Sequence, residues 1–214
     1  MKGSDRAAYP GLVAGTADPE VELASLLRAR KLDEAATLAL QAYGPEVYGF
    51  LVGLMGNEAE AAETFSQVGE DLWRGLPSFG LRCSVRTWLY LLARHAAARF
   101  RRSPWNRGAR TGDSALDAQL ALARSRTPDW ARTEAKDVLR TLRSELAPDD
   151  QVLLVLRLDR RLSWNDVALV TLGSEDAEAG AVQREAARLR KRFQVLKDEL
   201  RTRAAGLGLL SPDE

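Results

Sequence analysis

The most regular hydrophobic pattern of the chain lies close to its C-terminus. Apolar residues recur there at alternating steps of four and three, which predicts one buried side of an α-helix: Val182, Ala186, Leu189, Phe193, Leu196 and Leu200. The basic residues off this stripe are Arg184, Arg188, Arg190, Lys191 and Arg192. A helix with one apolar side and one cationic side suits an anionic partner such as DNA, or simply water.

The segment before this basic helix predicts two shorter helices. Ser163-Trp164-Asn165-Asp166 fits a capping box at a helix start, and Gly173 is a natural helix stop. Pro148-Asp149 opens an earlier, mostly apolar helix. Three helices of which the last is basic predict a helix-turn-helix unit, and the alternative is a solvated helix in a bundle. The connection 173–180 is unusually wide, and its acidic residues are Glu175, Asp176 and Glu178.

Residues 18–57 carry three further helix patterns. Asp18-Pro19 is expected to start the first helix, because proline is favoured in a first turn. Asp33 is expected to cap a second helix, which Gly44-Pro45 breaks. The same proline is expected to begin a third helix, which ends near Gly56-Asn57. The sequence therefore predicts a succession of short helices.

The next two predicted helices differ in charge. The helix from Glu58 to about Gly75 is expected to leave an acidic face exposed and to bury Ala61, Thr64, Phe65, Val68, Leu72 and Trp73. The helix 85–102 gathers arginines at its C-terminal end, where cations complement the helix dipole. Such segregated charge indicates two different partners. The tryptophans expected in the core, because each falls on an apolar stripe, are Trp73, Trp88 and Trp164.

The order of these patterns predicts an all-α chain made of two small helical domains. Glycine, proline and serine interrupt any long helix after residue 102, which predicts a flexible linker. The expected divisions are a flexible tail 1–17, a helical bundle 18–102, a linker 103–132, a helix-turn-helix domain 133–206 and a tail 207–214.

The composition is that of an ordinary soluble protein. The 214 residues are 45% hydrophobic and carry a net charge of only +1, so bulk charge is not expected to bind nucleic acid. No apolar run approaches the length of a membrane-spanning helix, and the N-terminus lacks the apolar core of a signal peptide. The single Cys83 excludes an intramolecular disulfide. We therefore expect a cytoplasmic protein without a membrane segment.

Residues for catalysis are scarce. The one histidine, His95, has no cysteine cluster near it in the sequence, so no zinc site of the usual kind is expected. No glycine-rich phosphate-binding motif is present, and no serine or cysteine has an evident base apart from that histidine. We expect no enzymatic activity, no metal, no cofactor and no small-molecule substrate.

Two stretches, about 32–102 and about 139–200, resemble the small bacterial sigma factors of the extracytoplasmic-function group. Glu60-Ala61-Ala62-Glu63, Gln67 and Leu72-Trp73-Arg74 have a spacing similar to the helix that grips RNA polymerase in that family. The resemblance implies core RNA polymerase and promoter DNA as partners, and it leaves an anti-sigma factor open. The implied polymerase contacts are Glu60, Glu63, Gln67, Glu70, Asp71 and Arg74.

The family's minus-10 and minus-35 contacts can be placed in the same way. Phe79, Trp88-Leu89-Tyr90 and Arg101-Arg102 resemble the loop and helix that open and bind the minus-10 element, and Leu162 to Ala168 resembles the start of the helix-turn-helix. The implied minus-10 contacts are Trp88, Arg94, His95, Arg99, Arg101 and Arg102. The implied minus-35 contacts are Gln183, Arg184, Arg188, Lys191 and Arg192. Aromatic and cationic side chains suit unstacked bases and phosphates.

The chain departs from the family at several positions. His95 and Arg99 stand where the family usually has Asn and then Asp, and Gly69 stands where an aromatic residue is usual. Three functions stay open: a promoter-specificity subunit of RNA polymerase, as the resemblance implies, a polymerase-independent helix-turn-helix regulator, and a helical protein-interaction module. Polymerase binding distinguishes the first, and salt-dependent duplex binding without polymerase distinguishes the second.

Overall fold

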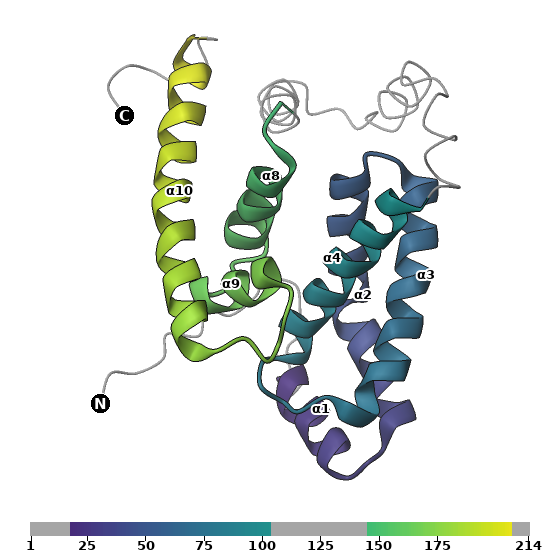
Figure 1. The fold of residues 1–214 in the computed structure, drawn as a ribbon. Helices are drawn as coiled ribbons and strands as arrows, with labels where there is room; N and C mark the ends of the chain where they lie inside the picture. The colour runs from purple at the N-terminus through teal and green to yellow at the C-terminus, as the bar shows by residue number, and fades with distance from the viewer. Residues whose placement is uncertain (1–17, 104–144, 207–214) are drawn as a thin grey trace.

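The computed structural model describes residues 18–103 and 145–206, and its regular elements are all helical, as the sequence predicts (Figure 1). In the N-terminal half these are α1 (Pro19–Arg28), α2 (Leu32–Met55), α3 (Glu58–Gly75), the short 3₁₀ turn η1 (Leu76–Ser78) and α4 (Val85–Arg102). In the C-terminal half they are α8 (Pro148–Leu154), the π-helical turn η2 (Val155–Asp159), α9 (Trp164–Leu172) and α10 (Ala179–Gly206). Among these described residues, no helix is both long and apolar enough to cross a membrane.

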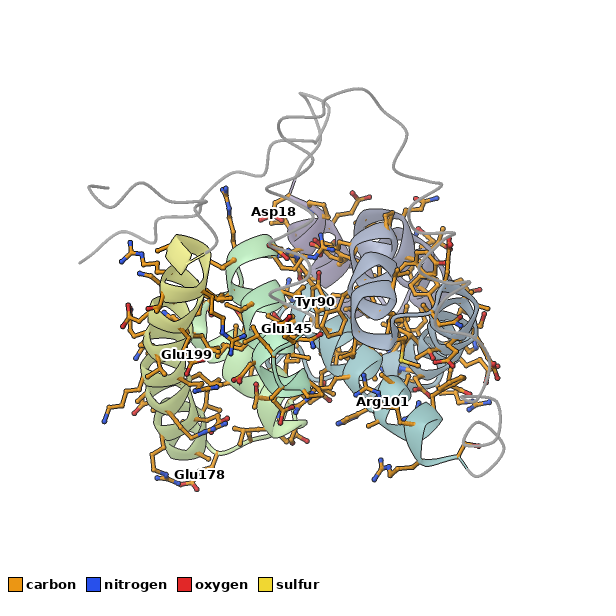
Figure 2. All side chains as sticks on the ribbon, turned by 90° about the horizontal axis from the view of Figure 1, so that it is seen from above. Asp18, Tyr90, Arg101, Glu145, Glu178 and Glu199 are labelled. Atoms are coloured by element: carbon orange, nitrogen blue, oxygen red, sulfur yellow. The ribbon has the colours of Figure 1, made fainter. Side chains whose placement is uncertain are left out.

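Helices α2, α3 and α4 pack against one another, and α1 lies across one end of α2 and α4 (Figure 1). The largest fully buried side chains of this half are Tyr90 and Phe50, whose rings meet edge to face at 5.4 Å between centroids. Tyr90 lies among the N-terminal helices, well away from Glu199 on α10 (Figure 2). Aromatic burial of this kind supplies much of a small domain's stability. It fixes α4, which carries the candidate arginines Arg94, Arg99, Arg101 and Arg102.

Helices α3 and α4 start at the capping residues of the sequence, whereas α2 starts at Leu32 with Lys31 at its N-cap, so the predicted cap by Asp33 is wrong. Asn57 accepts a hydrogen bond from the Glu60 N–H at 3.0 Å, and Ser84 accepts one from the Thr87 N–H at 3.0 Å. Helix α4 has a second, tertiary cap, because the Glu20 carboxylate of α1 accepts from the backbone N–H groups of residues 85 and 86, each at 2.9 Å. A carboxylate at a helix N-terminus also complements the helix dipole. Helix α1 therefore fixes where α4 begins.

Helix α2 runs unbroken through Gly44-Pro45, so the predicted break there is wrong. A proline inside a helix removes one backbone hydrogen bond and costs about 3 kcal/mol or more. The residues on both sides of it, Tyr43 and Val47, are buried, and the glycine lies close to the Phe65 ring of α3. Packing against neighbouring helices therefore outweighs the local preference to stop.

The C-terminal half follows its predicted pattern closely. Ser163 accepts from the Asp166 N–H at 3.2 Å at the start of α9, and Gly173 ends α9 in the left-handed conformation, with φ of 72°. The predicted stripe of α10 faces α8 and α9, and its fully buried members are Ala186, Leu189, Phe193 and Leu196. Trp164 is half-buried and meets the Phe193 ring edge to face at 5.5 Å. The acidic connection ends at Glu178, two residues before its predicted limit, because α10 begins at Ala179.

The two halves are in contact. Helix α9 lies against α4, α8 approaches α2, and the buried apolar residues form one contiguous core (Figure 1). The predicted linker 103–132 and the tails 1–17 and 207–214 lie outside the described residues, apart from Ser103. The domain limits therefore stay a prediction, while the contact between the halves is an observation that the sequence did not anticipate.

Candidate nucleic-acid and protein interfaces

The acidic face of α3 is largely open to solvent. Glu63 is exposed, and Glu70 accepts hydrogen bonds from Gln67 at 3.2 Å and from Arg74 at 3.1 Å along the same face. Exposed pairs of this kind add little to stability. Glu60 is half-buried in the first turn. These five predicted contacts therefore share one accessible surface on which a protein partner can dock.

Asp71 differs from its neighbours on α3. Its carboxylate forms an ion pair with Arg99 of α4, and the Asp71 side chain is only 19% exposed. The pair joins a residue predicted to contact polymerase to one predicted to contact DNA. Asp71 is thus turned toward α4 rather than into solvent, and it contributes to holding the two helices together.

Trp73 is 53% exposed, so its predicted place in the core is wrong. It follows Leu72, which is completely buried, and a step of one residue turns a helical side chain by about 100° away from the stripe. The sequence prediction counted Trp73 as part of the apolar stripe that Leu72 belongs to. Its indole instead extends the accessible surface of α3 with an aromatic group.

Trp88 lies in the core, as predicted for an aromatic residue on the stripe of α4. It is 4% exposed and stacks on Phe79, with 4.3 Å between ring centroids and 16° between ring planes. A Cβ on Gly75 would come within 2.7 Å of the indole, so the glycine makes room for it. Its predicted role beside DNA therefore stays a prediction, and its observed role is to hold the loop 79–84 on α4.

The arginines at the C-terminal end of α4 bind within the N-terminal half. Arg101 donates to the carbonyl of Leu54 on α2 at 2.7 Å, and Arg102 donates to the carbonyl of Ala98 one turn earlier at 3.1 Å. Arg102 is exposed, and Arg101 is half-buried. Cations here also complement the C-terminal end of the α4 dipole.

Arg94 is directed at the C-terminal half. Its guanidinium donates to the carbonyls of Val170, at 2.9 Å, and Thr171, which end α9, and to the carboxylate of Asp149 at 3.1 Å. A cation at this point satisfies carbonyls that have no partner within the helix. This residue, predicted to bind DNA, therefore caps α9 in the structure.

His95 lies beside Arg94 on the side of α4 that faces α9. Its ring is half-buried and forms a hydrogen bond with the Gly173 backbone. Burial lowers the pKa of His95 from its usual 6.5, and the positive charges of Arg99 and Arg94 lower it further. The hydrogen bond and Asp71 oppose this shift without reversing it. The imidazole is therefore neutral at neutral pH.

The lowered pKa predicts a loss of stability in mild acid. A group whose pKa falls on folding contributes stability above its unfolded pKa, here 6.5, and loses that contribution as pH falls through the folded-state pKa. We expect the urea concentration at the unfolding midpoint to decrease as the pH is lowered from about 7 to about 5. The midpoint of His95→Gln is expected to decrease less over this range. If the urea midpoint depended on pH equally in both proteins, His95 would not be the cause of the loss of stability in acid.

The cationic face of α10 is partly free and partly paired. Gln183, Arg184 and Lys191 are exposed. Arg188 donates to Glu185 at 2.7 and 2.6 Å, which raises the pKa of the arginine and lowers that of the carboxyl. These groups remain at the surface of α10, so contact with DNA requires no change of the helix itself.

Arg192, also predicted to contact DNA, has a structural partner. It donates to both carboxylate oxygens of Asp150 on α8, at 2.9 and 2.5 Å, and Asp150 is 8% exposed. This hydrogen bonding raises the pKa of Arg192. The pair fixes α10 against α8 and thereby sets the orientation of the cationic face.

Several interface residues were missed by sequence reasoning. Arg86 is 9% exposed and donates through Nη2 to Glu46 of α2 and to the carbonyl of Arg160, each at 2.9 Å. Arg82, in the loop before α4, forms an ion pair with Asp176 of the acidic connection. These partners are 40 to 94 positions apart in the sequence, so periodicity carries no signal for them.

A comparison with protein families finds a match in the N-terminal half of the chain. Residues 39–107 match the family described as Sigma-70 region 2, a stretch that begins inside α2 and includes all of α3 and α4. The match supports a sigma factor of the sigma-70 family. No curated protein matches the chain. The sigma region 2 stretch contains both the acidic face of α3 and the arginine-rich α4, whereas α8, α9 and α10 lie outside it.

Proposed function

We propose that this chain is a sigma factor of the extracytoplasmic-function group that binds core RNA polymerase and directs it to promoters. The observation that carries the proposal is the matched region 2 stretch, in which an accessible acidic face lies directly beside an arginine-rich helix. Segregated charge on adjacent helices lets one domain hold a protein partner and a nucleic acid together. The C-terminal three-helix unit, with its cationic α10, supports assignment of a second DNA-binding domain.

The polymerase-binding surface is the exposed part of α3. Glu63 and Glu70 supply negative charge, and Trp73 supplies an exposed aromatic side chain on the same helix. Interfaces commonly combine a large aromatic anchor with a charged rim. Asp71 contributes indirectly, because its pair with Arg99 fixes α3 against α4.

The promoter-binding surfaces are the loop 79–84 with α4 for the minus-10 element, and α10 for the minus-35 element. Arg99, Arg101 and Arg102 suit phosphate contacts at the exposed end of α4. Arg184, Arg188 and Lys191 suit contacts in a duplex groove, where arginine binds guanine edges and lysine binds phosphates. Arg192 positions α10 through Asp150.

A charge reversal on α3 tests the proposal. Glu63→Lys is expected to weaken binding of the full chain to purified core RNA polymerase about tenfold, because it places a cation in an acidic docking surface. Glu22→Lys on α1 is the matched control, since it makes the same charge change at an exposed site on another helix. Fluorescence anisotropy of labelled protein titrated with core polymerase measures both.

Two results would contradict the proposal. Wild-type protein that does not bind core polymerase would remove the sigma assignment, and duplex binding with a steep salt dependence would then favour a polymerase-independent regulator. If Glu63→Lys and Glu22→Lys bound core polymerase with equal affinity, the acidic face of α3 would not be the polymerase-binding surface.

A further inference from the structure

The C-terminal half covers one side of the minus-10 helix and its loop. Arg82 pairs with Asp176, Arg94 binds the end of α9 and Asp149, and His95 contacts the Gly173 backbone. We call Arg82, Arg94 and His95 the masked face. All of its members lie in the loop 79–84 or in α4, and all of their C-terminal partners are carboxylates or backbone groups at or near one end of α9.

The partners of the masked face resemble the groups of a nucleic acid in their chemistry. Asp149 and Asp176 present anionic oxygens to guanidinium groups, as phosphates would, and the α9 carbonyls present neutral acceptors, as base edges would. Helix α9 also directs the negative end of its dipole at Arg94. A phosphate would therefore have to compete with these acceptors for the guanidinium N–H groups that they occupy.

We propose that the C-terminal end of α9 and the acidic connection 173–178 form an intramolecular inhibitor that occupies the masked face until nucleic acid or polymerase displaces it. The inference rests on the proposed function, because it assigns the masked face to promoter DNA. It also gives the wide acidic connection a role, since this connection supplies Asp176, the partner of Arg82.

The strength of the contact suits reversible inhibition. The Arg82 and Asp176 side chains are 62% and 60% exposed, and such pairs are weak and screened by salt. Glu175, next to Asp176, is half-buried, and one of its carboxylate oxygens is buried without a hydrogen-bond partner. Burial and the neighbouring charge raise the pKa of Glu175, so keeping its charged form in the closed state is unfavourable. The contact is therefore able to open when a competing anion binds.

The reactivity of the Cys83 thiol reports whether this contact is closed or open. It is the only cysteine of the chain and lies between Arg82 and Ser84 in the covered loop. Burial raises the pKa of its thiol to about 12, and the negative charges of Glu175 and Asp166 from the C-terminal half add to this. Only the thiolate reacts readily with alkylating agents. Separation of the halves is therefore expected to make Cys83 reactive.

The test compares two charge reversals in the full chain. Asp176→Arg replaces the partner of Arg82 with a like charge, and Glu178→Arg makes the same charge change at an exposed position two residues away. We measure the rate of Cys83 alkylation by iodoacetamide at fixed pH, and the affinity for a fluorescent mixed-sequence single-stranded DNA. Asp176→Arg is expected to raise the alkylation rate and the DNA affinity several-fold over Glu178→Arg.

A charge-exchanged double variant tests the ion pair itself, and alkylation, DNA affinity and polymerase binding are measured separately. Arg82→Asp combined with Asp176→Arg rebuilds the ion pair with its charges exchanged, so slow alkylation is expected to return. Equal alkylation rates for Asp176→Arg, Glu178→Arg and wild type would overturn the closed contact. Faster alkylation of Asp176→Arg at a DNA affinity equal to that of Glu178→Arg would overturn the inhibition. Polymerase binding through α3 is measured independently, so its absence would instead sink the proposed function.

Discussion

Glu46→Ala is expected to lower the free energy of unfolding by about 3–5 kcal/mol, the cost of leaving one member of a buried ion pair without its partner. The Arg86 and Glu46 side chains are 11% and 19% exposed, and both guanidinium contacts to the carboxylate are lost in the variant. Arg86 would keep only its bond to the Arg160 carbonyl among these contacts. The remaining charge would then lie in a poorly solvated place between α2 and α4.

Urea unfolding followed by circular dichroism measures this effect. The matched control is Glu34→Ala on the same helix, because Glu34 pairs with Lys31 at the surface and should cost about 0.5 kcal/mol or less. Replacing both buried partners, with Glu46→Leu and Arg86→Met, is expected to recover much of the loss. A Glu46→Ala protein as stable as Glu34→Ala would show that the pair is solvated in solution.

Trp88→Ala is expected to cost about 3–5 kcal/mol of unfolding free energy, because it empties a large buried site. The indole fills the space beside Gly75 and stacks on Phe79, so its loss also releases the loop before α4. Any loss of DNA binding in this variant would then follow from the fold rather than from a missing base contact. Trp88→Phe keeps an aromatic ring in the site and is expected to cost less.

Trp73→Ala is the matched control for this prediction. Trp73 is 53% exposed, so its removal is expected to change stability by about 0.5 kcal/mol or less. Thermal unfolding of the two variants side by side separates the core role from the surface role. Equal losses for Trp73→Ala and Trp88→Ala would contradict the burial of Trp88.

Local signals in the sequence were enough to predict most helices. The limits of α3 and α4 agree with the prediction because Asn57 and Ser84 are strong capping residues next to clear apolar stripes. The stripe of α10 and the glycine stop of α9 were predicted for the same reason. Each of these features depends on residues within a few positions of one another.

The errors arose where distant residues decide the outcome. Helix α2 continues through Pro45 because buried neighbours on other helices hold it, and no local pattern reports them. Trp73 was placed inward as part of the apolar stripe that Leu72 belongs to, although its helical phase points it outward. The candidate DNA contacts were found by charge and by family resemblance, but charge alone could not show that Arg94 and Arg192 have partners within the chain. Tertiary pairing determines which cations remain available to a ligand.

The Glu20 cap on α4 decides how this protein can be divided for study. The matched sigma region 2 stretch begins at residue 39, whereas the carboxylate that accepts from the first N–H groups of α4 lies on α1, well before that point. Leu23 of α1 is also completely buried in the shared core. A fragment cut to the limits of the family match would therefore lack the support of its own α4, so an expression fragment needs to begin at Asp18 or earlier.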